Sequence, residues 1–366
     1  LSGCDLGVFP SYYEPWGYTP QESAAHAVPT ISTDQAGFGL WVQSTFKEHS
    51  GVIIMKRKGR EIQTITNDLF DILKNFLSWT DADMQLRRES AWTIAVQANW
   101  GEFYKFYAAA YDRAAGIARE YAEKLALFDY RTAYRRTFAG AVTTQPHFRR
   151  FTAVAKLPQE IARLRELAYN LWWSWNSRAL ELFASLDPQL WTDMGNNPVR
   201  MLETVSAERL IEAKNNAIYI SLYESVMKQF DDYMADKTLC RRLSVSPEIK
   251  WSSPVAYFST EYGLHESLPI YSGGLGVLSG DHIKTASDLN IPLVGVGLLY
   301  RSGYFKQVID KNGVQIAEYP ECDFSNMPLQ IVQDEKGDEV QISLELPGRT
   351  LYANIWELQI GRLSLY

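Results

Sequence analysis

The sequence predicts an α/β fold with more than one domain. Three observations support this prediction: residues 6–40 alternate between strand-like and helical patterns, residues 61–126, 157–175 and 204–233 have helical patterns, and residues after 310 alternate apolar with polar side chains. The chain has 366 residues, a length typical of two domains or three. Its 46% hydrophobic and 22% charged residues supply enough apolar material for hydrophobic cores.

Charge and composition argue against several classes of protein. The chain has 36 basic and 43 acidic residues, and the net charge of −7 disfavours binding to nucleic acid. The longest apolar run, residues 292–300, is shorter than the roughly 20 residues that a membrane span needs. Cys4, Cys240 and Cys322 are few, odd in number and far apart, without metal-ligand spacing. We therefore expect a cytoplasmic protein without a metal, a disulfide framework or a membrane partner.

Residues 6–40 predict a compact βαβ unit. The strands LGVFPS and VPTIST flank a helix, and the loop DQAGFG follows the second strand. We expect the helix to begin with Thr19 as its N-cap and Pro20 at its first position. Glu22 then lies three residues after the cap, which predicts a capping box.

Helices and a linker are predicted next. The segment EIQTITNDLFDILKNFLSW has one apolar face, and two further helices are expected at 82–98 and 101–125. Residues 131–155 contain five arginines and no acidic residue, which predicts a basic linker. A solvated connector and a docking site for an anionic partner are both open interpretations. The apolar face of the first helix consists of Ile62, Ile65, Leu69, Ile72, Leu73 and Phe76.

The second half begins with helical patterns at 157–175 and 204–233. Their spacing predicts that Trp172 and Trp175 are buried and that Trp173 is the exposed ring, with core packing preferred over a sugar-stacking platform. Beyond them we expect a strand VAYFS, a helix over 275–289 and a fully buried strand PLVGVGLLY. A turn at EKGD separates two later strands.

The junction EPWGYTPQE is a candidate site for an anion and a polyol. A helix start offers unpaired backbone N–H groups and the positive end of the helix dipole, which bind phosphate. Gly17 allows close backbone approach, and Glu14 can accept hydrogen bonds from hydroxyl groups. A diphosphate flanked by sugar hydroxyls would suit this arrangement. For Glu22 a purely structural capping role is the alternative.

The run LGVFPSYYEPWGYTPQE, continued by PTISTDQAGFG, resembles the signature of the non-plant glycogen synthases, retaining glucosyltransferases with two Rossmann-like domains of the GT-B type. The resemblance implies that Glu14 contacts the glucose hydroxyls of a nucleotide-glucose, and that Trp16 and Gly17 present backbone amides to the glucose. It also implies that Thr19 and the helix start face the diphosphate and that Glu22 meets the ribose. The family's other domain would precede residue 1.

Eukaryotic members of that family carry an arginine-rich helix that responds to a sugar phosphate. At about the matching position, residues 84–100, this chain has only Arg87 and Arg88. We therefore expect no such activation.

A glycine cluster, YSGGLGVLSGDHIKTASDL, is the second candidate site. Gly273, Gly274 and Gly276 enter a helix, where consecutive glycines let backbone amides surround a phosphate. The spacing fits neither a Walker loop nor a dinucleotide fingerprint. A tight turn with close helix–strand packing is the alternative. We expect the nearby His265 and His282 to be packed or surface residues.

The glycine cluster belongs to a longer pattern. LAYNLWWSWN, YFSTEYGLHESLPIYSGGLG and PLVGVGLLYRSGYFKQ resemble the amino-terminal part of the bacterial α-glucan phosphorylases, over about 157–366. The resemblance implies phosphorolysis of α-1,4-glucan to glucose 1-phosphate, with Gly273, Gly274 and Gly276 facing the substrate phosphate and glucosyl group.

The same resemblance implies a pyridoxal phosphate cofactor that acts through its own phosphate group. Glu261 and Tyr262 match a segment that lines the cofactor cleft. The Schiff-base lysine belongs to the family's carboxyl-terminal domain, beyond Tyr366, so neither Lys284 nor Lys306 is expected to fill that role.

Taken together, the sequence predicts part of a fused hexosyltransferase of α-glucan metabolism. Its ligands would be α-glucan, phosphate and nucleotide-glucose, and homo-oligomer formation is left open. Both ends look cut, so we expect neither activity from the chain alone. The alternatives are a non-catalytic glucan-binding scaffold and an artefactual join of two reading frames. The predicted parts are a partial GT-B domain with carboxyl-terminal helices at 1–130, the linker at 131–155, a helical region at 156–250, and at 251–366 a partial α/β phosphorylase domain with a β-rich end.

Overall fold

The computed structural model describes residues 3–125, 155–236 and 254–366, with the backbone alone for 119–125. The chain divides into two compact units, Leu1–Ala109 and Ala110–Tyr366. Both contain helices and sheets, so the predicted α/β class is confirmed. The arginines of the predicted linker lie outside the described residues.

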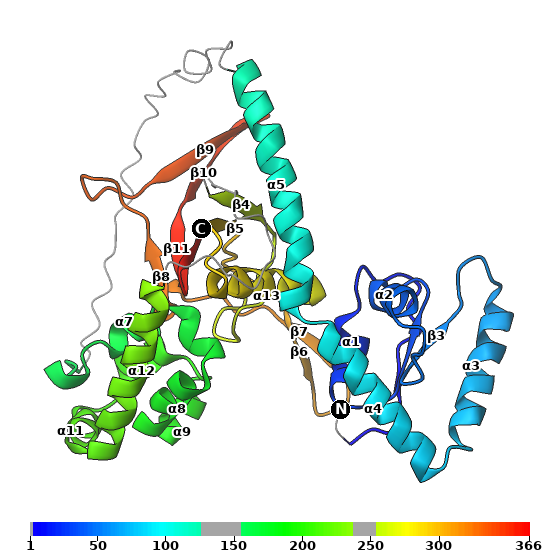
Figure 1. Cartoon of the computed structure of the whole chain (residues 1–366). Coiled ribbons are helices and arrows are strands. Elements are labelled where there is room, and N and C mark those ends of the chain that lie inside the picture. Colours follow the sequence, from blue (N-terminus) through cyan, green and yellow to red (C-terminus); the bar gives the residue numbers. More distant parts are fainter. Residues whose placement is uncertain (1–2, 126–154, 237–253) are drawn as a thin grey trace. The chain divides into compact units, whose positions relative to one another are not determined.

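The first unit contains a three-stranded parallel sheet in the order β1-β2-β3 (Figure 1). The central strand β2 is buried along its whole length, and the predicted βαβ unit is confirmed. Its elements are β1 (Gly7–Val8), α1 (Tyr18–Ala25), β2 (Thr30–Thr33), α2 (Gly37–Thr45), β3 (Val52–Met55), α3 (Ile62–Phe76), α4 (Asp81–Gln97) and α5 (Trp100–Leu125), whose residues after Ala109 belong to the second unit.

The predicted loop DQAGFG is wrong in its second half, because α2 begins at Gly37. A Cβ on Gly37 would overlap the carbonyl oxygen of Pro15, and one on Gly39 would overlap that of Thr33. These glycines let the helix lie directly against backbone, so they are packing residues of a helix.

Only part of the predicted apolar face of α3 is buried. Ile65 packs with Ile31 and Met55, whereas Ile62 is 67% exposed. The face is only partly buried because α3 packs against the sheet chiefly through β3, at the sheet's edge. The two following helices agree with the prediction, and α4 begins with a capping box of Thr80 and Asp83.

The helical part of the second unit is divided more finely than its periodicity predicts. Asn170 ends the first helical stretch and accepts a hydrogen bond from the Trp172 amide, and Asn216 caps α12 in the same way. Its elements are η1 (Gln159–Ile161), α7 (Leu164–Ala168), η2 (Leu171–Trp175), α8 (Ser177–Leu186), α9 (Pro188–Asp193), α10 (Pro198–Thr204), α11 (Ala207–Asn215) and α12 (Ala217–Ala235).

The tryptophan prediction needs a correction. Trp173, predicted to be exposed, is fully buried, Trp172 is buried and Trp175 is only partly buried. The tight 3₁₀ geometry of η2 rotates the side chains away from the positions expected for an α-helix. Core packing is the correct interpretation, since the Trp173 ring contacts those of Phe183 and His265.

The rest of the second unit is built on a five-stranded mixed sheet in the order β4-β5-β12-β11-β8, and α13 packs against it (Figure 1). The strand predicted to be fully buried is short and alternates in burial. Its Gly295 lies under Ile283 of α13. The elements are β4 (Val255–Phe258), α13 (Gly274–Asp288), β5 (Leu293–Val296), β6 (Lys306–Ile309), β7 (Gln315–Glu318), η3 (Phe324–Asn326), β8 (Leu329–Ile331), β9 (Gln341–Leu346), β10 (Arg349–Asn354), β11 (Trp356–Ile360) and β12 (Leu363–Leu365).

Side-chain hydrogen bonds join this sheet to the helical part. Asn170 donates to the Gly361 carbonyl at 2.9 Å and accepts from the Gly361 amide at 2.8 Å. The Arg362 guanidinium donates to the carbonyls of Tyr233 and Ser287. These bonds satisfy buried polar groups and fix the helices against α13 and the sheet.

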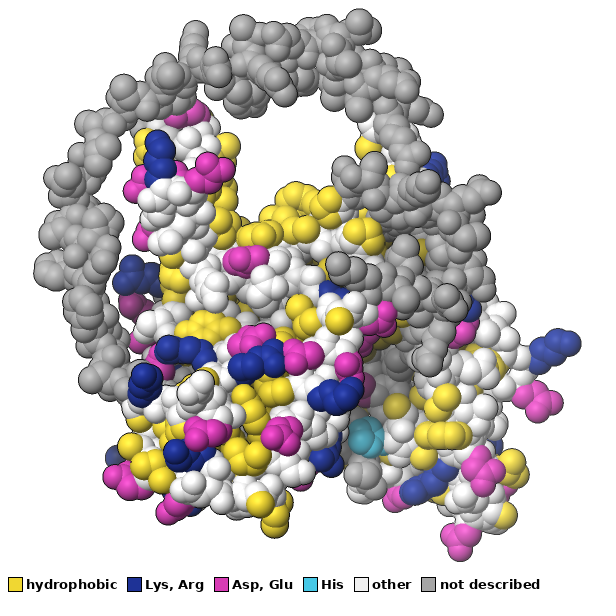
Figure 2. Space-filling view, turned by 60° about the vertical axis from the view of Figure 1, so that its left-hand side comes forward, with side chains coloured by type: hydrophobic (Ala, Val, Ile, Leu, Met, Phe, Trp, Pro, Cys, Tyr) yellow, Lys and Arg dark blue, Asp and Glu magenta, His cyan; other side chains and the backbone are white. Residues whose placement is uncertain are grey.

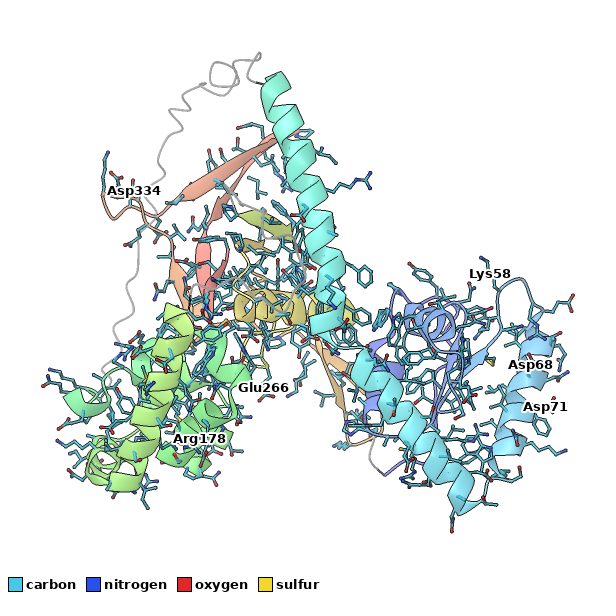
Figure 3. All side chains as sticks on the ribbon, viewed as in Figure 1. Lys58, Asp68, Asp71, Arg178, Glu266 and Asp334 are labelled. Atoms are coloured by element: carbon cyan, nitrogen blue, oxygen red, sulfur yellow. The ribbon has the colours of Figure 1, made fainter. Side chains whose placement is uncertain are left out.

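The surface mixes charges of both signs. On the face shown in Figure 2, basic and acidic side chains are interspersed. The predicted EKGD turn is present, and its Asp334 accepts hydrogen bonds from the amides of Lys336 and Asp338 (Figure 3). Among the described helices, none is both long and apolar enough to span a bilayer.

Candidate functional site

The first candidate site lies at the carboxyl edge of the β1-β2-β3 sheet. The loops after parallel strands meet at one edge, which is where α/β sheets bind ligands. Glu14 joins two of these loops: its amide donates to the Gln35 carbonyl at 3.1 Å, and its carbonyl accepts from the Gly37 amide at 3.0 Å. Its half-buried carboxylate has no hydrogen bond or ion pair within the described parts of the chain. The backbone of Glu14 is therefore fixed while its carboxylate is available to a ligand.

The predicted capping box at α1 is wrong. The helix begins at Tyr18 with Gly17 as its N-cap, and no side chain caps it. Gly17 has φ +99°, a left-handed conformation that glycine adopts readily, and it turns the chain into the helix two residues earlier than predicted. Thr19 and Glu22 are exposed on the helix, so neither side chain is occupied by capping.

The Trp16 side chain anchors this loop. Its ring packs against those of Phe38, Trp41 and Phe103 at centroid distances of 6.0, 5.9 and 5.1 Å. The indole N–H donates to Gln21 Oε1, and Gln21 Nε2 donates to the Ala98 carbonyl at 2.9 Å. The Trp16 ring is thus structural, its carbonyl accepts from the Phe38 amide, and a role for its amide in binding glucose stays a prediction.

Basic residues follow β3 at the same edge. The Arg57 guanidinium donates to the Pro10 carbonyl and lies 3.6 Å from the centroid of the Tyr12 ring. Its amide donates to Asp34 Oδ1 at 2.7 Å. Lys58 projects from this segment (Figure 3). Arg57 was not predicted as a site residue from the sequence, although a run of basic residues directly after a strand could have indicated it.

The second candidate site is the start of α13, where the glycine cluster divides into two kinds of residue. Gly273 is the N-cap and Gly274 the first helical residue; both are exposed, and a Cβ on either would meet no atom within 4 Å. A Cβ on Gly276 would lie 2.5 Å from Tyr271 Cβ, and one on Gly280 would overlap the Gly263 carbonyl. Close packing therefore explains Gly276 and Gly280 but leaves Gly273 and Gly274 without a structural reason.

Glu261 holds this loop in place. One carboxylate oxygen, Oε2, accepts from the Ser272 amide at 3.0 Å, and the other, Oε1, accepts from the Tyr304 hydroxyl at 3.2 Å. Ser272 immediately precedes the open glycines. Tyr304 was not singled out from the sequence, because nothing local links residues 43 positions apart.

Tyr262 is a core residue. Its side chain is 1% exposed, and its hydroxyl donates to the Tyr257 carbonyl at 2.7 Å. Burial raises the pKa of this hydroxyl. The ring packs beside Gly297, where it supports the sheet, and a role in a cofactor cleft stays a prediction.

Both histidines near the cluster are packed, as expected. Burial lowers the pKa of His282 to about 4, and its ring lies 4.6 Å from that of Tyr257. The pKa of His265 is also lowered by burial, and its Nδ1 accepts from the Ser267 amide at 3.1 Å. Burial thus favours the neutral form of both imidazoles.

Lys284 is more buried than its sequence context suggests. Its ammonium group donates to the Leu264 carbonyl at 2.6 Å, and burial lowers its pKa. Across the described segments, no group of three or more His, Cys, Asp or Glu side chains could hold a metal ion.

Two family models match the chain. One, described as glycogen synthase, matches residues 1–160, and the other, described as a protein of unknown function (DUF3417), matches residues 157–268. The first model extends through the predicted linker, and the second crosses the predicted boundary at 250.

The similar proteins include phosphorylases and a glycogen synthase. Maltodextrin phosphorylase of Thermococcus litoralis is 47% identical over 212 residues, which cover 58% of this chain and 25% of that protein. Glycogen phosphorylase of Mycobacterium tuberculosis is 41% identical over 220 residues, which cover 59% of this chain and 26% of that protein. Glycogen [starch] synthase of Caenorhabditis elegans is 33% identical over 109 residues, which cover 29% of this chain and 16% of that protein.

These comparisons confirm the predicted resemblances. A segment similar to glycogen synthases is followed by one similar to phosphorylases, in the order that the sequence motifs predict. The chain spans about a quarter of the length of the phosphorylases it matches.

Proposed function

We propose that the second unit acts in the phosphorolysis of α-1,4-glucan, with residues 272–276 binding the phosphate and the adjoining glucosyl group. The observation that carries this proposal is the pair of exposed, unobstructed glycines at the start of a 15-residue helix. Amides at a helix start bind anionic oxygens, and the absence of side chains lets a phosphate approach the backbone. The similarity to glycogen and maltodextrin phosphorylases supports the same conclusion.

In this proposal Glu261 is a positioning residue. Its carboxylate accepts the Ser272 amide and the Tyr304 hydroxyl, so it sets the conformation of the loop that precedes Gly273. The amides of the first turn then stabilise the charge of the phosphate that attacks the glucan. Preorganisation of the loop avoids an ordering cost when phosphate binds.

Pyridoxal phosphate is the cofactor that the proposed activity implies, and it would supply proton transfer to the substrate phosphate through its own phosphate group. A lysine would hold this cofactor as a Schiff base. Lys284 is half-buried with its ammonium group on the Leu264 carbonyl, and Lys306 lies exposed on β6. Neither fits that role, and we expect that this chain alone does not release glucose 1-phosphate from glucan.

A second function is favoured by the first unit, which we propose to bind the nucleotide-glucose donor of a glycogen synthase. Glu14 has a fixed backbone and an available carboxylate, and Glu22 is not needed for capping. Glu14 is joined to the loop after β2, Glu22 lies on the helix that begins at Tyr18, and the basic segment after β3 would face the diphosphate. The GT-B arrangement and the four part boundaries given above belong to this proposal.

Calorimetric titration can test both functions on the same chain. Inorganic phosphate, UDP-glucose and ADP-glucose are the probes, and the variants are the Gly273→Ala/Gly274→Ala pair and Glu14→Gln. The glycine variant should weaken phosphate binding at least tenfold and leave sugar-nucleotide binding unchanged, and Glu14→Gln should do the reverse. Phosphate binding that is insensitive to the glycine variant would overturn the first proposal. Glucan binding without any phosphate binding would instead favour a scaffold.

A further inference from the structure

A cavity of about 430 Å³ opens within the second unit, and no residue of the 272–276 loop lines it. Its walls come from the turn between α9 and α10, from the segment after Leu264 and from residues 303–327. The side chains that matter for its chemistry are Asn197, Arg200, Glu266, Tyr304, Glu321 and Asp323.

The charge of the lining disfavours an anion. Glu266, Glu321 and Asp323 contribute three acidic groups against the guanidinium of Arg200 in the lining, and Arg301, which lies 3.7 Å from Glu321, still leaves the carboxylates in excess. A phosphate in this cavity would meet a net repulsion. The carboxylates are also too dispersed for a cation, since the described residues contain no group of three that could hold a metal. Dispersed acceptors with a few donors suit the hydroxyl groups of a neutral polyol.

The polar walls are held in position before any ligand arrives. Asn196 Nδ2 donates to Glu266 Oε1 at 2.7 Å, which leaves Oε2 to accept from a ligand (Figure 3 labels Glu266). Asn197 caps α10 through its side-chain oxygen and donates to the Asn326 carbonyl at 2.8 Å. The helical part and the 303–327 segment are thereby joined across the cavity.

Tyr304 supplies an aromatic wall. Its side chain is 51% exposed, and its hydroxyl is held by Glu261 at 3.2 Å, which restrains the ring. Pro269 and Pro320 add apolar surface to the lining. Aromatic rings that are fixed and half exposed stack on the apolar faces of sugars, while carboxylates at the rim accept their hydroxyls.

We propose that this cavity is a second glucan site, which binds one or two glucose units of an α-1,4-glucan by stacking on Tyr304 and hydrogen bonding to Glu266. The choice of glucan among neutral polyols rests on the proposed function. The site is distinct from the phosphate loop but is connected to it, because Tyr304 and Ser272 share the Glu261 carboxylate. Occupancy of the cavity should therefore change the affinity of the loop for phosphate, and the reverse, by the same factor.

The test measures maltoheptaose binding to the 366-residue chain by calorimetry, with and without inorganic phosphate. Tyr304→Ala and Glu266→Gln should each weaken binding at least fivefold. Tyr304→Phe keeps the ring and loses the hydroxyl, so it should bind maltoheptaose normally while phosphate no longer changes that affinity. Glu181→Gln, which removes an exposed partner of Arg178 on α8, is the matched control and should behave as wild type.

Two outcomes separate this inference from the proposed function. If maltoheptaose does not bind, or binds equally to Tyr304→Ala and Glu266→Gln, the cavity is not a glucan site, whatever the phosphate titration gives. If both variants lose maltoheptaose but the loop does not bind phosphate, the cavity site stands and the proposed phosphorolysis fails. Urea midpoints within error of wild type show that the exposed substitutions leave the fold intact.

Discussion

Alanine substitutions in the glycine cluster separate a ligand site from a packing motif. Gly273 has an extended backbone, Gly274 is the first residue of α13, and a Cβ on either meets open space. Alanine also restricts the unfolded chain more than glycine does. We expect the Gly273→Ala/Gly274→Ala pair to leave the free energy of unfolding unchanged or to raise it by up to about 1 kcal/mol.

Gly276→Ala should do the opposite. Its Cβ would lie 2.5 Å from Tyr271 Cβ, which is closer than real side chains approach, and 3.1 Å from Glu261 Oε2, which is a tight contact. Tyr271 or the start of α13 must shift to accommodate it. Overpacking of this kind costs about 1–3 kcal/mol. The two variants thus differ in the sign of their effect on stability.

Urea unfolding followed by tryptophan fluorescence measures these changes, and phosphate titration of the same samples measures binding. The reasoning requires that the Gly273→Ala/Gly274→Ala protein is as stable as wild type and yet binds phosphate at least tenfold more weakly. If that protein loses more than about 1 kcal/mol, the two glycines are structural after all. If it is stable and binds phosphate normally, the loop is not the anion site.

Three further predictions address other parts of the molecule. Burial lowers the pKa of His282 to about 4 from 6.5, so its stabilising contribution is complete above pH 6.5 and is lost as the pH falls towards 4. Relative to His282→Gln, the free energy of unfolding of wild type should fall by at most about 3 kcal/mol over that range in urea titrations, and parallel pH profiles of the two proteins would contradict this. Trp173→Ala should cost about 3–5 kcal/mol in the same assay, while Trp173→Phe should leave maltoheptaose affinity unchanged; weaker glucan binding by the Phe variant would contradict the core assignment. Hexose phosphate should not bind to α4, because Arg87 donates to the Ser50 carbonyl and stacks on Trp79 while Arg88 pairs with Asp5. Shifts of the α4 amide signals in an NMR titration with hexose phosphate would disprove this prediction.

Periodicity predicted elements well where one face of a segment is buried and the other is not. The βαβ unit, α4 and α13 follow their patterns because strand alternation and helical spacing report that local environment. The start of α1 did not follow its pattern. Two rules competed there, a Thr-Pro-x-Glu capping signal and a glycine two residues earlier, and the left-handed conformation of Gly17 decided the boundary.

The sequence predicted only part of the chemistry of the candidate sites. A cluster of glycines shows that the backbone needs room, but the pattern does not distinguish Gly276, which has a neighbour at 2.5 Å, from Gly273, which has none. The contact between Tyr304 and Glu261 depends on the tertiary fold, as does the join of Asn197 to Asn326 that closes one side of the cavity. Motifs therefore indicated the two candidate anion sites, whereas the cavity depends on the arrangement of three distant segments.

The two candidate anion sites differ in a way that follows from their helix starts. In α13 the first intrahelical bond runs from the Val277 amide to the Gly273 carbonyl, so three preceding amides can face a ligand. In α1 the third position is Pro20, which has no N–H, and the helix is only eight residues long. Backbone amides can therefore carry phosphate binding at α13. At α1 they cannot do so alone, so in the proposed function a diphosphate there would need the basic segment after β3, and the carboxylates of Glu14 and Glu22 would accept from sugar hydroxyls rather than face the anion.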